Sequence, residues 1–157
     1  LNEISRKLKS LKPKPVHLHM EPGRYLVSEG GVLVTNVTQI RQKRNHRFVG
    51  VATGMNTLIR PALYNAWHDI VNITFAKKTE YNVIPADNYY EKDTELLTSH
   101  VVGPICETAD VLGHSRNLPT NTAVGDVILI ANAGAYGYVM GSNYNMREPA
   151  SEIVIEQ

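Results

Sequence analysis

Apolar side chains recur at helical spacing at the start of the chain. Leu1, Ile4, Leu8 and Leu11 lie three or four positions apart, and lysines and arginines occupy the other faces. We predict a short helix that ends at Lys12–Pro15, because the two prolines there lack amide donors and restrict the residues before them. Since the helical pattern already includes the first residue, which is not Met, we expect the sequence to be a fragment of a longer protein.

The next segments alternate apolar and polar residues, as strands do. Val16–Met20 alternates apolar residues with histidines and predicts a strand, which the turn-forming Pro22 and Gly23 then end. Further along, the β-branched run Val32–Ile40 and the segment Phe48–Ala52 flank a polar turn. This arrangement predicts a β-hairpin.

The remainder of the chain predicts one more helix and several short strands. Asn56–His68 repeats apolar residues at helical spacing, and Pro61 fits only the first turn of a helix, so we expect the helix from about Arg60. Strand-like runs follow at Asp69–Phe75, Tyr81–Ile84, Ser99–Ile105, Asp126–Ala131 and Glu152–Glu156. Many short strands and few helices predict a mainly β fold, either a β-sandwich or a small β-barrel.

The composition fits one ordinary soluble domain. Of the 157 residues, 43% are hydrophobic and 20% are charged, which is enough apolar surface for one core. The 16 basic and 15 acidic residues nearly cancel. The strong positive field that attracts nucleic acid is therefore missing, and we expect no nucleic-acid partner. The densest basic stretch, Arg41–Arg47, is more typical of a solvated strand end or a hairpin turn.

The sequence also favours a cytoplasmic location. Apolar runs all fall short of the roughly 20 residues that cross a bilayer, so we expect no membrane association. Cys106 is the only cysteine, which excludes an internal disulfide and fits a reducing compartment.

This cysteine has a carboxylate as its neighbour at the end of a predicted strand. In Gly-Pro-Ile-Cys-Glu-Thr, Cys106 directly precedes Glu107. A thiol that is partly exposed and close to a charge can donate a proton to a substrate. Free cysteines are more often buried and inert, so the residues alone leave both interpretations open.

Two short motifs offer groups that bind anions. Glu21–Arg24 reads Glu-Pro-Gly-Arg, in which a glycine turn leads into a helix and Arg24 supplies a guanidinium for phosphate or carboxylate. In the predicted helix, Arg60 and Tyr64 are four positions apart and share a face that suits a carboxylate. The alternatives are a plain turn with a surface arginine, and an exposed arginine packed on a tyrosine.

A third motif combines a phenol with small residues. Gly134–Gly137 places Tyr136 between glycines and alanines, and Gly141–Asn145 continues with Ser, Asn and Tyr. Small residues let the backbone approach a ligand closely, and a tyrosine can donate to phosphate or lie against a flat ring. A strand corner would look similar.

Three residues near the start resemble a set of metal ligands. His17, His19 and Glu21 recur every second position and would share one face of a strand. Ordinary strand histidines explain the same spacing without a metal and are the favoured interpretation.

Four motifs in this order resemble the C-terminal half of the diaminopimelate decarboxylases. They are Glu21–Arg24, Gly54–Tyr64, Val101–Leu112 and Gly125–Gly137, and the resemblance spans about Val16–Ile155. These enzymes belong to the fold-type III pyridoxal phosphate decarboxylases. The order of the four motifs along the chain argues against a chance resemblance and favours the functional interpretation of each motif.

The resemblance implies a two-domain architecture. In this family an N-terminal (β/α)8 barrel holds pyridoxal 5'-phosphate, and a C-terminal β-sandwich or Greek-key β-barrel domain completes the site across a homodimer. Residues 1–30 would then be the last helix and strand of the barrel, and residues 31–157 the C-terminal β domain. The expected partners are the barrel, a second copy of the chain and a small amino-acid substrate.

The resemblance also implies a role for each motif. Cys106 would be the catalytic residue, which donates a proton to the substrate α-carbon after carbon dioxide leaves. The implied cofactor-binding residues are Glu21, Pro22, Gly23, Arg24 and Tyr136, and the implied substrate-binding residues are Arg24, Arg60, Tyr64, Glu107 and Tyr136. No metal site is implied.

The implied reaction is the decarboxylation of meso-2,6-diaminopimelate to L-lysine in lysine biosynthesis. The Schiff-base lysine of the family lies early in the barrel, in a Tyr-Ala-x-Lys motif, and no lysine here has that context. We therefore expect this chain alone to be inactive. Ala76–Leu97, polar and acidic with a Tyr89–Tyr90 pair, departs from the family and is expected to form a surface loop.

Three alternatives remain. The first is a relative that acts on ornithine, arginine or a carboxylated polyamine. The ornithine type would be expected to carry Asp after the cysteine and to lack Arg-Pro-Ala-Leu-Tyr, and Glu107 and Arg60 instead favour a substrate with a distal carboxylate. A metal- or ligand-binding β-barrel module that uses His17 and His19 belongs to a different functional class. The last alternative is a unit that serves only in folding and dimerisation.

Overall fold

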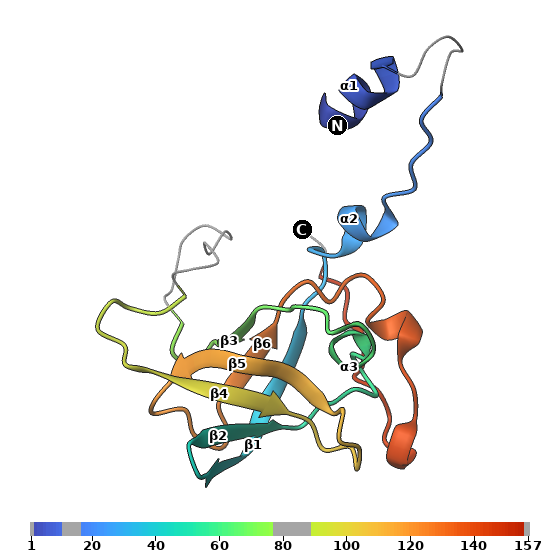
Figure 1. Ribbon diagram of the computed structural model, residues 1–157. Coiled ribbons are helices and arrows are strands. Elements are labelled where there is room, and N and C mark those ends of the chain that lie inside the picture. Colours follow the sequence, from blue (N-terminus) through green and yellow to red (C-terminus); the bar gives the residue numbers. More distant parts are fainter. Residues whose placement is uncertain (1, 11–16, 77–88, 156–157) are drawn as a thin grey trace.

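The structure is a computed structural model that describes residues 2–10, 17–76 and 89–155 (Figure 1). The predicted break at Lys12–Pro15 and the predicted strand Tyr81–Ile84 lie outside the described residues, as do Leu1, Leu11 and Val16.

Within the described residues, six strands form one sheet. They are β1 (Leu33–Lys43), β2 (His46–Val51), β3 (Ile70–Asn72), β4 (Leu96–Val102), β5 (Val111–Pro119) and β6 (Val127–Ile130). Their order in the sheet is β3-β6-β1-β2-β4-β5. Neighbouring strands are antiparallel except for β2 and β4, which are parallel. The mainly β fold is confirmed.

Strand β1 bends the sheet towards closure. Its first half pairs with β6, where Leu33 lies opposite Ile130, and its second half pairs with β2. The register shifts between Val37 and Gln39, which marks a β-bulge, and bulges increase the local twist. The two edge strands, β3 and β5, contact each other. The result is a nearly closed barrel.

Strands β1 and β2 form the predicted hairpin. The chain reverses at Arg44, whose φ of 52° lies in the left-handed region that tight hairpin turns require. The basic stretch Arg41–Arg47 therefore consists of two strand ends and the hairpin turn between them, as predicted, but it is not solvated throughout. Arg47 itself is buried, and its Nη1 donates to the carbonyl oxygen of Pro119 at 2.9 Å, which joins β2 to the end of β5.

Alternate residues of the strands fill the barrel. Val37, Val49, Leu118, Ile128 and Ile130 are at most 2% exposed. Burying a side chain of this size contributes about 1.5–3 kcal/mol relative to leaving it in water. This core fixes the ends of β4 and β6, and the loops that follow these two strands carry the candidate functional residues.

A buried polar network closes the barrel beside β3. Asn72 donates through Nδ2 to Asp126 Oδ2 at 2.8 Å, and its backbone amide donates to the Tyr90 hydroxyl at 2.8 Å. Tyr90 is only 8% exposed, and burial raises the pKa of its phenol. The prediction that Ala76–Leu97 is a surface loop is therefore wrong at Tyr90, because the tyrosine hydroxyl accepts from the buried amide of Asn72. Residues 77–88 of that segment lie outside the described residues.

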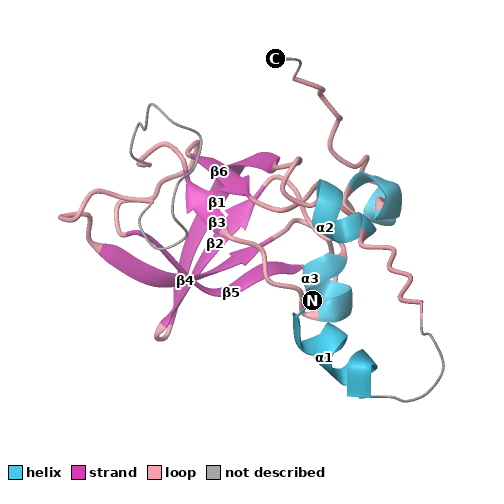
Figure 2. Cartoon of the chain, turned by 90° about the horizontal axis from the view of Figure 1, so that it is seen from above, coloured by secondary structure: helices cyan, strands magenta, loops and turns pink. Residues whose placement is uncertain are grey.

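The helices are short. They are α1 (Asn2–Ser10), α2 (Gly23–Val27) and α3 (Arg60–Tyr64), with 3-10 turns at Tyr138–Met140 and Tyr144–Met146. Seen from above, α2 and α3 lie on the same side of the strands (Figure 2). Helix α1 confirms the predicted N-terminal helix, and none of its residues is buried. Helix α3 begins where expected but ends at Tyr64, because Asn65 adopts a left-handed φ of 51°.

The remaining sequence predictions have mixed outcomes. The strands expected at 69–75, 99–105 and 126–131 are confirmed as β3, β4 and β6, with shifted ends. The strands expected at Val16–Met20 and Glu152–Glu156 are wrong, because the described residues there are exposed and pair with no other described strand. The boundary at residue 30 stays a prediction.

Strand β5 escaped prediction altogether. Its middle residues, Gly113–Asn117, are mostly polar, so the alternation of apolar and polar side chains is lost. Ser115 adopts a φ of 53°, and the register against β4 shifts near it. An irregular strand of this kind gives no two-residue pattern in the sequence.

Candidate functional site

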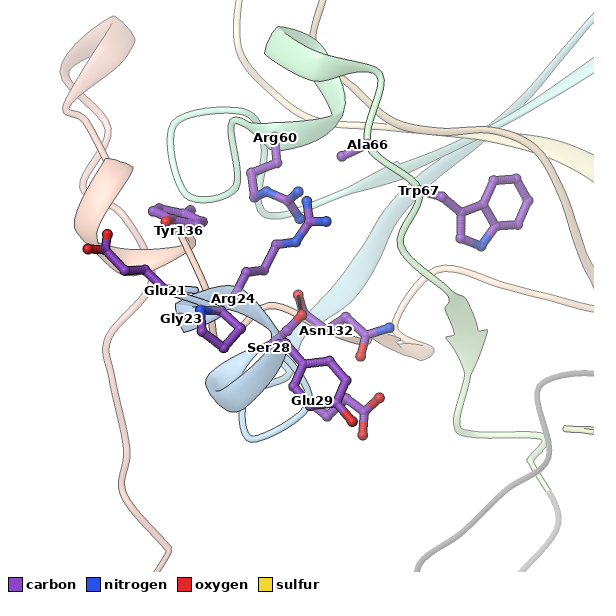
Figure 3. A pocket seen from close by; sticks show the side chains of 12 residues that line it. Glu21, Gly23, Arg24, Ser28, Glu29, Arg60, Ala66, Trp67, Asn132 and Tyr136 are labelled. Atoms are coloured by element: carbon purple, nitrogen blue, oxygen red, sulfur yellow. Dashed lines mark hydrogen bonds between the residues drawn. The ribbon is translucent and has the colours of Figure 1, made fainter. Parts of the chain in front are cut away.

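An open pocket of about 770 Å³ lies between α2, α3 and the loop that follows β6 (Figure 3). Six of the predicted site residues line it: Glu21, Pro22, Gly23, Arg24, Arg60 and Tyr136. The other lining residues are Tyr25, Ser28, Glu29, Ala66, Trp67 and Asn132. The structure thus brings together three motifs that are far apart in the sequence.

Two arginines reach into this pocket from different helices. Arg24 belongs to α2 and Arg60 opens α3, and their guanidinium groups lie towards each other in Figure 3. Glu21 and Glu29 line the same pocket, yet among the described residues no carboxylate is within ion-pair distance of either arginine. Two converging cations without a counter-charge favour an anionic ligand, and a guanidinium can hold a carboxylate or a phosphate through two hydrogen bonds.

The loop after β6 is tied to the end of α2. The amide of Gly134 donates to the carbonyl oxygen of Ser28 at 3.0 Å, and the Ser28 hydroxyl donates to the carbonyl oxygen of Asn132 at 3.3 Å. A Cβ on Gly134 would lie 2.7 Å from the Gly31 amide nitrogen, so only glycine permits this approach. The loop in turn presents Tyr136, which is half-exposed and has a φ of 58°.

A buried histidine contacts one of the two arginines. His68 Nε2 lies 3.3 Å from Arg60 Nη1, and His68 Nδ1 lies 2.9 Å from the carbonyl oxygen of Ala131. Burial lowers the pKa of His68 and so favours the neutral imidazole.

Three predicted site residues lie outside the pocket. Tyr64 is 61% exposed on α3, and Cys106 and Glu107 are exposed in the loop that follows β4. The backbone amide of Cys106 donates to Asn145 Oδ1 at 2.7 Å, and the Tyr144 hydroxyl donates to Glu107 Oε2 at 3.3 Å. We call Cys106, Glu107, Tyr144 and Asn145 the Cys106 cluster. The negative charge of Glu107 raises the pKa of Tyr144.

A single carboxylate holds the loop that carries this cluster. Asp110 is 3% exposed and accepts hydrogen bonds from the amides of Met55 and Ile105, both at 2.6 Å. It thereby links the segment between β2 and α3 to the loop after β4. Burial raises the pKa of Asp110, and the two hydrogen bonds oppose that effect.

Sequence reasoning missed Trp67 as a pocket residue. The helical spacing of Asn56–His68 placed it on a helix face, but the chain leaves the helix at Asn65. Trp67 is 66% exposed, and the guanidinium carbon of Arg116 lies 3.3 Å from its ring centroid. Trp67 is the only tryptophan in the sequence, and that was a signal for a possible ligand contact. Its contact with Arg116 depends on the fold and leaves no signal in the sequence.

The structure gives no support to a metal site at the start of the chain. His17 and His19 lie in an exposed segment without regular structure. Over residues 2–10, 17–76 and 89–155, no three His, Cys, Asp or Glu side chains are grouped to hold a metal ion. In the same described residues, no helix has the length and apolar character needed to cross a bilayer.

Comparison with known proteins shows where these motifs occur elsewhere. Residues 24–134 match the C-terminal sheet domain of pyridoxal-dependent decarboxylases. The diaminopimelate decarboxylase of Pseudomonas fluorescens is 38% identical over 146 residues, which is 93% of this chain and 31% of that protein. The chain therefore spans about a third of the length of the relatives that it matches.

Solved structures agree with the sequence comparison. A diaminopimelate decarboxylase from M. jannaschii in complex with L-lysine superposes with a TM-score of 0.68 at 34% identity, over 94% of this chain and 30% of that one. The enzyme from Helicobacter pylori, also in complex with L-lysine, gives 0.63 at 38% identity, over 80% of this chain and 26% of that one. By its sequence match and its barrel fold, the chain belongs to the pyridoxal-dependent decarboxylase family and contains that family's C-terminal sheet domain.

Proposed function

We propose that this chain is the C-terminal part of a diaminopimelate decarboxylase, which converts meso-2,6-diaminopimelate into L-lysine and carbon dioxide in lysine biosynthesis. The observation that carries the proposal is the convergence of Arg24 and Arg60 in one pocket beside Tyr136. Relatives of that name cover most of the chain, and two solved relatives contain L-lysine, the product of the proposed reaction.

The charges in the pocket suit a substrate with two carboxylates. Diaminopimelate carries an amino-acid group at each end, so the enzyme must hold one end while the other reacts. Arg60, with Tyr64 one turn away on the same helix, would bind the distal carboxylate. Ornithine has no such carboxylate and would leave the buried Arg60 without an anion, which disfavours it as a substrate.

The same pocket fits the phosphate of pyridoxal 5'-phosphate. Glu21 to Arg24 and Tyr136 would line that phosphate, with the Arg24 guanidinium and the Tyr136 hydroxyl as donors. Gly23 leaves space there, because a Cβ at this position would meet no atom within 4 Å. When bound, the cofactor supplies an electron sink for the carbanion that decarboxylation creates.

The rest of the site would come from other parts of the enzyme. We infer that an N-terminal barrel, of which residues 1–30 are the end, supplies the lysine that anchors the cofactor, so this chain alone is inactive. We also infer a cytoplasmic enzyme, in keeping with its single cysteine.

The Cys106 cluster would complete the pocket of a partner chain. Cys106 and Glu107 are exposed and do not line the pocket of their own chain, which is consistent with a homodimer that exchanges these residues between its two sites. In that arrangement the Cys106 thiol donates a proton to the substrate α-carbon after carbon dioxide leaves. Glu107 accepts hydrogen bonds from the distal ammonium group, which Arg60 cannot bind.

The test is a comparison of two substrates with the intact enzyme, in which this chain is joined to its barrel. We expect turnover of meso-2,6-diaminopimelate and, at the same concentration, little turnover of ornithine. Arg60→Met, which removes the charge but keeps a long side chain, should raise the KM for diaminopimelate. Equal turnover of both substrates, or an unchanged KM in Arg60→Met, would overturn the assignment of the substrate.

A further inference from the structure

His68 joins the buried arginine of the pocket to the end of β6. It lies between α3 and β3 and is 0% exposed. Its two ring nitrogens face different partners, Ala131 and Arg60, at 2.9 and 3.3 Å. Ala131 directly follows β6 and begins the loop that presents Asn132 and Tyr136 to the pocket. One imidazole thus connects two of the elements that build the site.

The two contacts require one protonation state of the ring. A carbonyl oxygen can only accept, so the Nδ1 atom that faces Ala131 carries the hydrogen. A guanidinium can only donate, so the Nε2 atom that faces Arg60 must offer its lone pair. Only the neutral imidazole with its hydrogen on Nδ1 satisfies both partners.

The surroundings of His68 favour this neutral form. Burial lowers its pKa most, and the positive charges of Arg60 on α3 and Arg116 on β5 lower it further. The hydrogen bond to Ala131 and the carboxylate of neighbouring Asp69 act in the opposite direction. At neutral pH the lone pair of Nε2 is therefore free to accept from Arg60.

We propose that His68 is a positioning residue, which holds the Arg60 guanidinium in the orientation that receives the distal carboxylate of the substrate. Arg60 has a long side chain with several rotatable bonds, and a guanidinium binds a carboxylate well only when its plane is correctly aligned. The contact with Nε2 fixes one Nη atom, which leaves the opposite edge for the ligand. This inference rests on the proposed function of Arg60.

The proposed role predicts a specific kinetic signature. The distal carboxylate lies at the unreactive end of the substrate, so its contact contributes equally before and during the reaction. Loss of alignment should therefore raise KM and leave kcat nearly unchanged.

Two substitutions separate the two contacts of the ring in the intact enzyme. In His68→Asn the side-chain amide can still donate to Ala131, but it offers no acceptor to Arg60. In His68→Gln the longer side chain can place its oxygen near the position of Nε2 and accept from Arg60. We expect His68→Asn to raise the KM for diaminopimelate roughly tenfold or more, with kcat within about threefold, and His68→Gln to recover most of the affinity.

The pH dependence gives an independent reading. In the unmodified enzyme, KM should rise as the pH falls through the lowered pKa of His68, because the protonated ring repels Arg60. His68→Gln should lack that rise. A merely structural histidine would give the two variants equal KM values at every pH.

The outcomes distinguish this inference from the proposal on which it rests. If Arg60→Met leaves KM unchanged, the substrate-binding role of Arg60 fails. If Arg60→Met raises KM but His68→Asn does not, or if His68→Asn and His68→Gln behave alike, the positioning role fails. Should neither His68 variant fold, ¹⁵N NMR of the unmodified histidine decides. We expect hydrogen on Nδ1 and none on Nε2, and the opposite tautomer would overturn the inference.

Discussion

Replacing Asp110 by alanine should destabilise the protein and release the loop that carries Cys106 and Glu107. The carboxylate is almost fully buried, and it accepts one hydrogen bond from each of two loops, through the amides of Met55 and Ile105. The Ile105 amide is buried and would be left without an acceptor, whereas the Met55 amide is only partly buried and could bind water instead.

The magnitude follows from these two amides. A buried donor without a partner costs about 1–3 kcal/mol, so the two amides together cost up to about 6 kcal/mol, and the partly buried Met55 amide contributes less than the Ile105 amide. Part of this is offset, because the variant no longer buries a carboxylate, whose raised pKa shows that its charge is held at a cost. We expect a net loss of about 2–4 kcal/mol in the free energy of unfolding, or about 10 °C in Tm for a chain of this length.

The neighbouring glycines sharpen the choice of variants. A Cβ on Gly54 would lie 2.6 Å from Asp110 Oδ2, so the space around the Asp110 carboxylate is tightly packed. A side chain larger than Asp would therefore not fit at position 110. Asp110→Asn keeps the shape and one acceptor oxygen but turns an NH2 group towards the second amide. Its loss in the free energy of unfolding should therefore be at least about half of the loss in Asp110→Ala.

The assay is thermal unfolding followed by circular dichroism. Asp93→Ala is the matched control, because it makes the same chemical change at an exposed position. If the Tm of Asp110→Ala falls no further than that of Asp93→Ala, the reasoning about these two hydrogen bonds is refuted.

Two further predictions concern the cysteine and a row of histidines. Cys106→Ala in the intact enzyme should lower kcat by roughly 10²- to 10⁴-fold and leave the cofactor absorbance intact, whereas unchanged turnover would remove its role as proton donor. His46 Nδ1 and His114 Nδ1 lie 3.2 and 3.4 Å from the two ring nitrogens of His100, whose pKa is lowered by burial and by both neighbours. Like His68, His100 takes up a proton less readily in the folded than in the unfolded protein. The free energy of unfolding should therefore be highest above about pH 6.5, the usual pKa of histidine, and should decline as the pH falls below it. A Tm that stays constant between pH 8 and pH 5.5, or a decline that His100→Gln does not reduce, would contradict this.

Local sequence patterns predicted the parts of the fold that have regular periodicity. The hairpin followed from the β-branched run before Arg44, and the start of α3 followed from Pro61. The helix end at Asn65 depends on a single left-handed residue, and β5 depends on pairing with β4 across an irregular register, so neither leaves a periodic signal. Tyr90 shows the same limit, because its burial is decided by a distant partner, Asn72.

The candidate site was predictable in its motifs but not in its geometry. Arg24, Arg60 and Tyr136 stand out in short motifs, and the structure places them around one pocket. The contact between His68 and Arg60 depends on where β3 and β6 lie, which local sequence does not show. The separation of Cys106 from that pocket is likewise a property of the folded loops.

The most direct test of the account is a mixture of two variants of the intact enzyme, assayed at a diaminopimelate concentration so far below the raised KM of Arg60→Met that each variant alone has little activity. If Cys106 completes the pocket of a partner chain, a mixed dimer of Arg60→Met and Cys106→Ala contains one pocket with both residues intact. Random reassembly of equal amounts should therefore restore about a quarter of the unmodified activity, since half of the dimers are mixed and each has one good site. Activity no higher than the sum of the two separate variants would show that the arginine and the cysteine do not meet across a dimer.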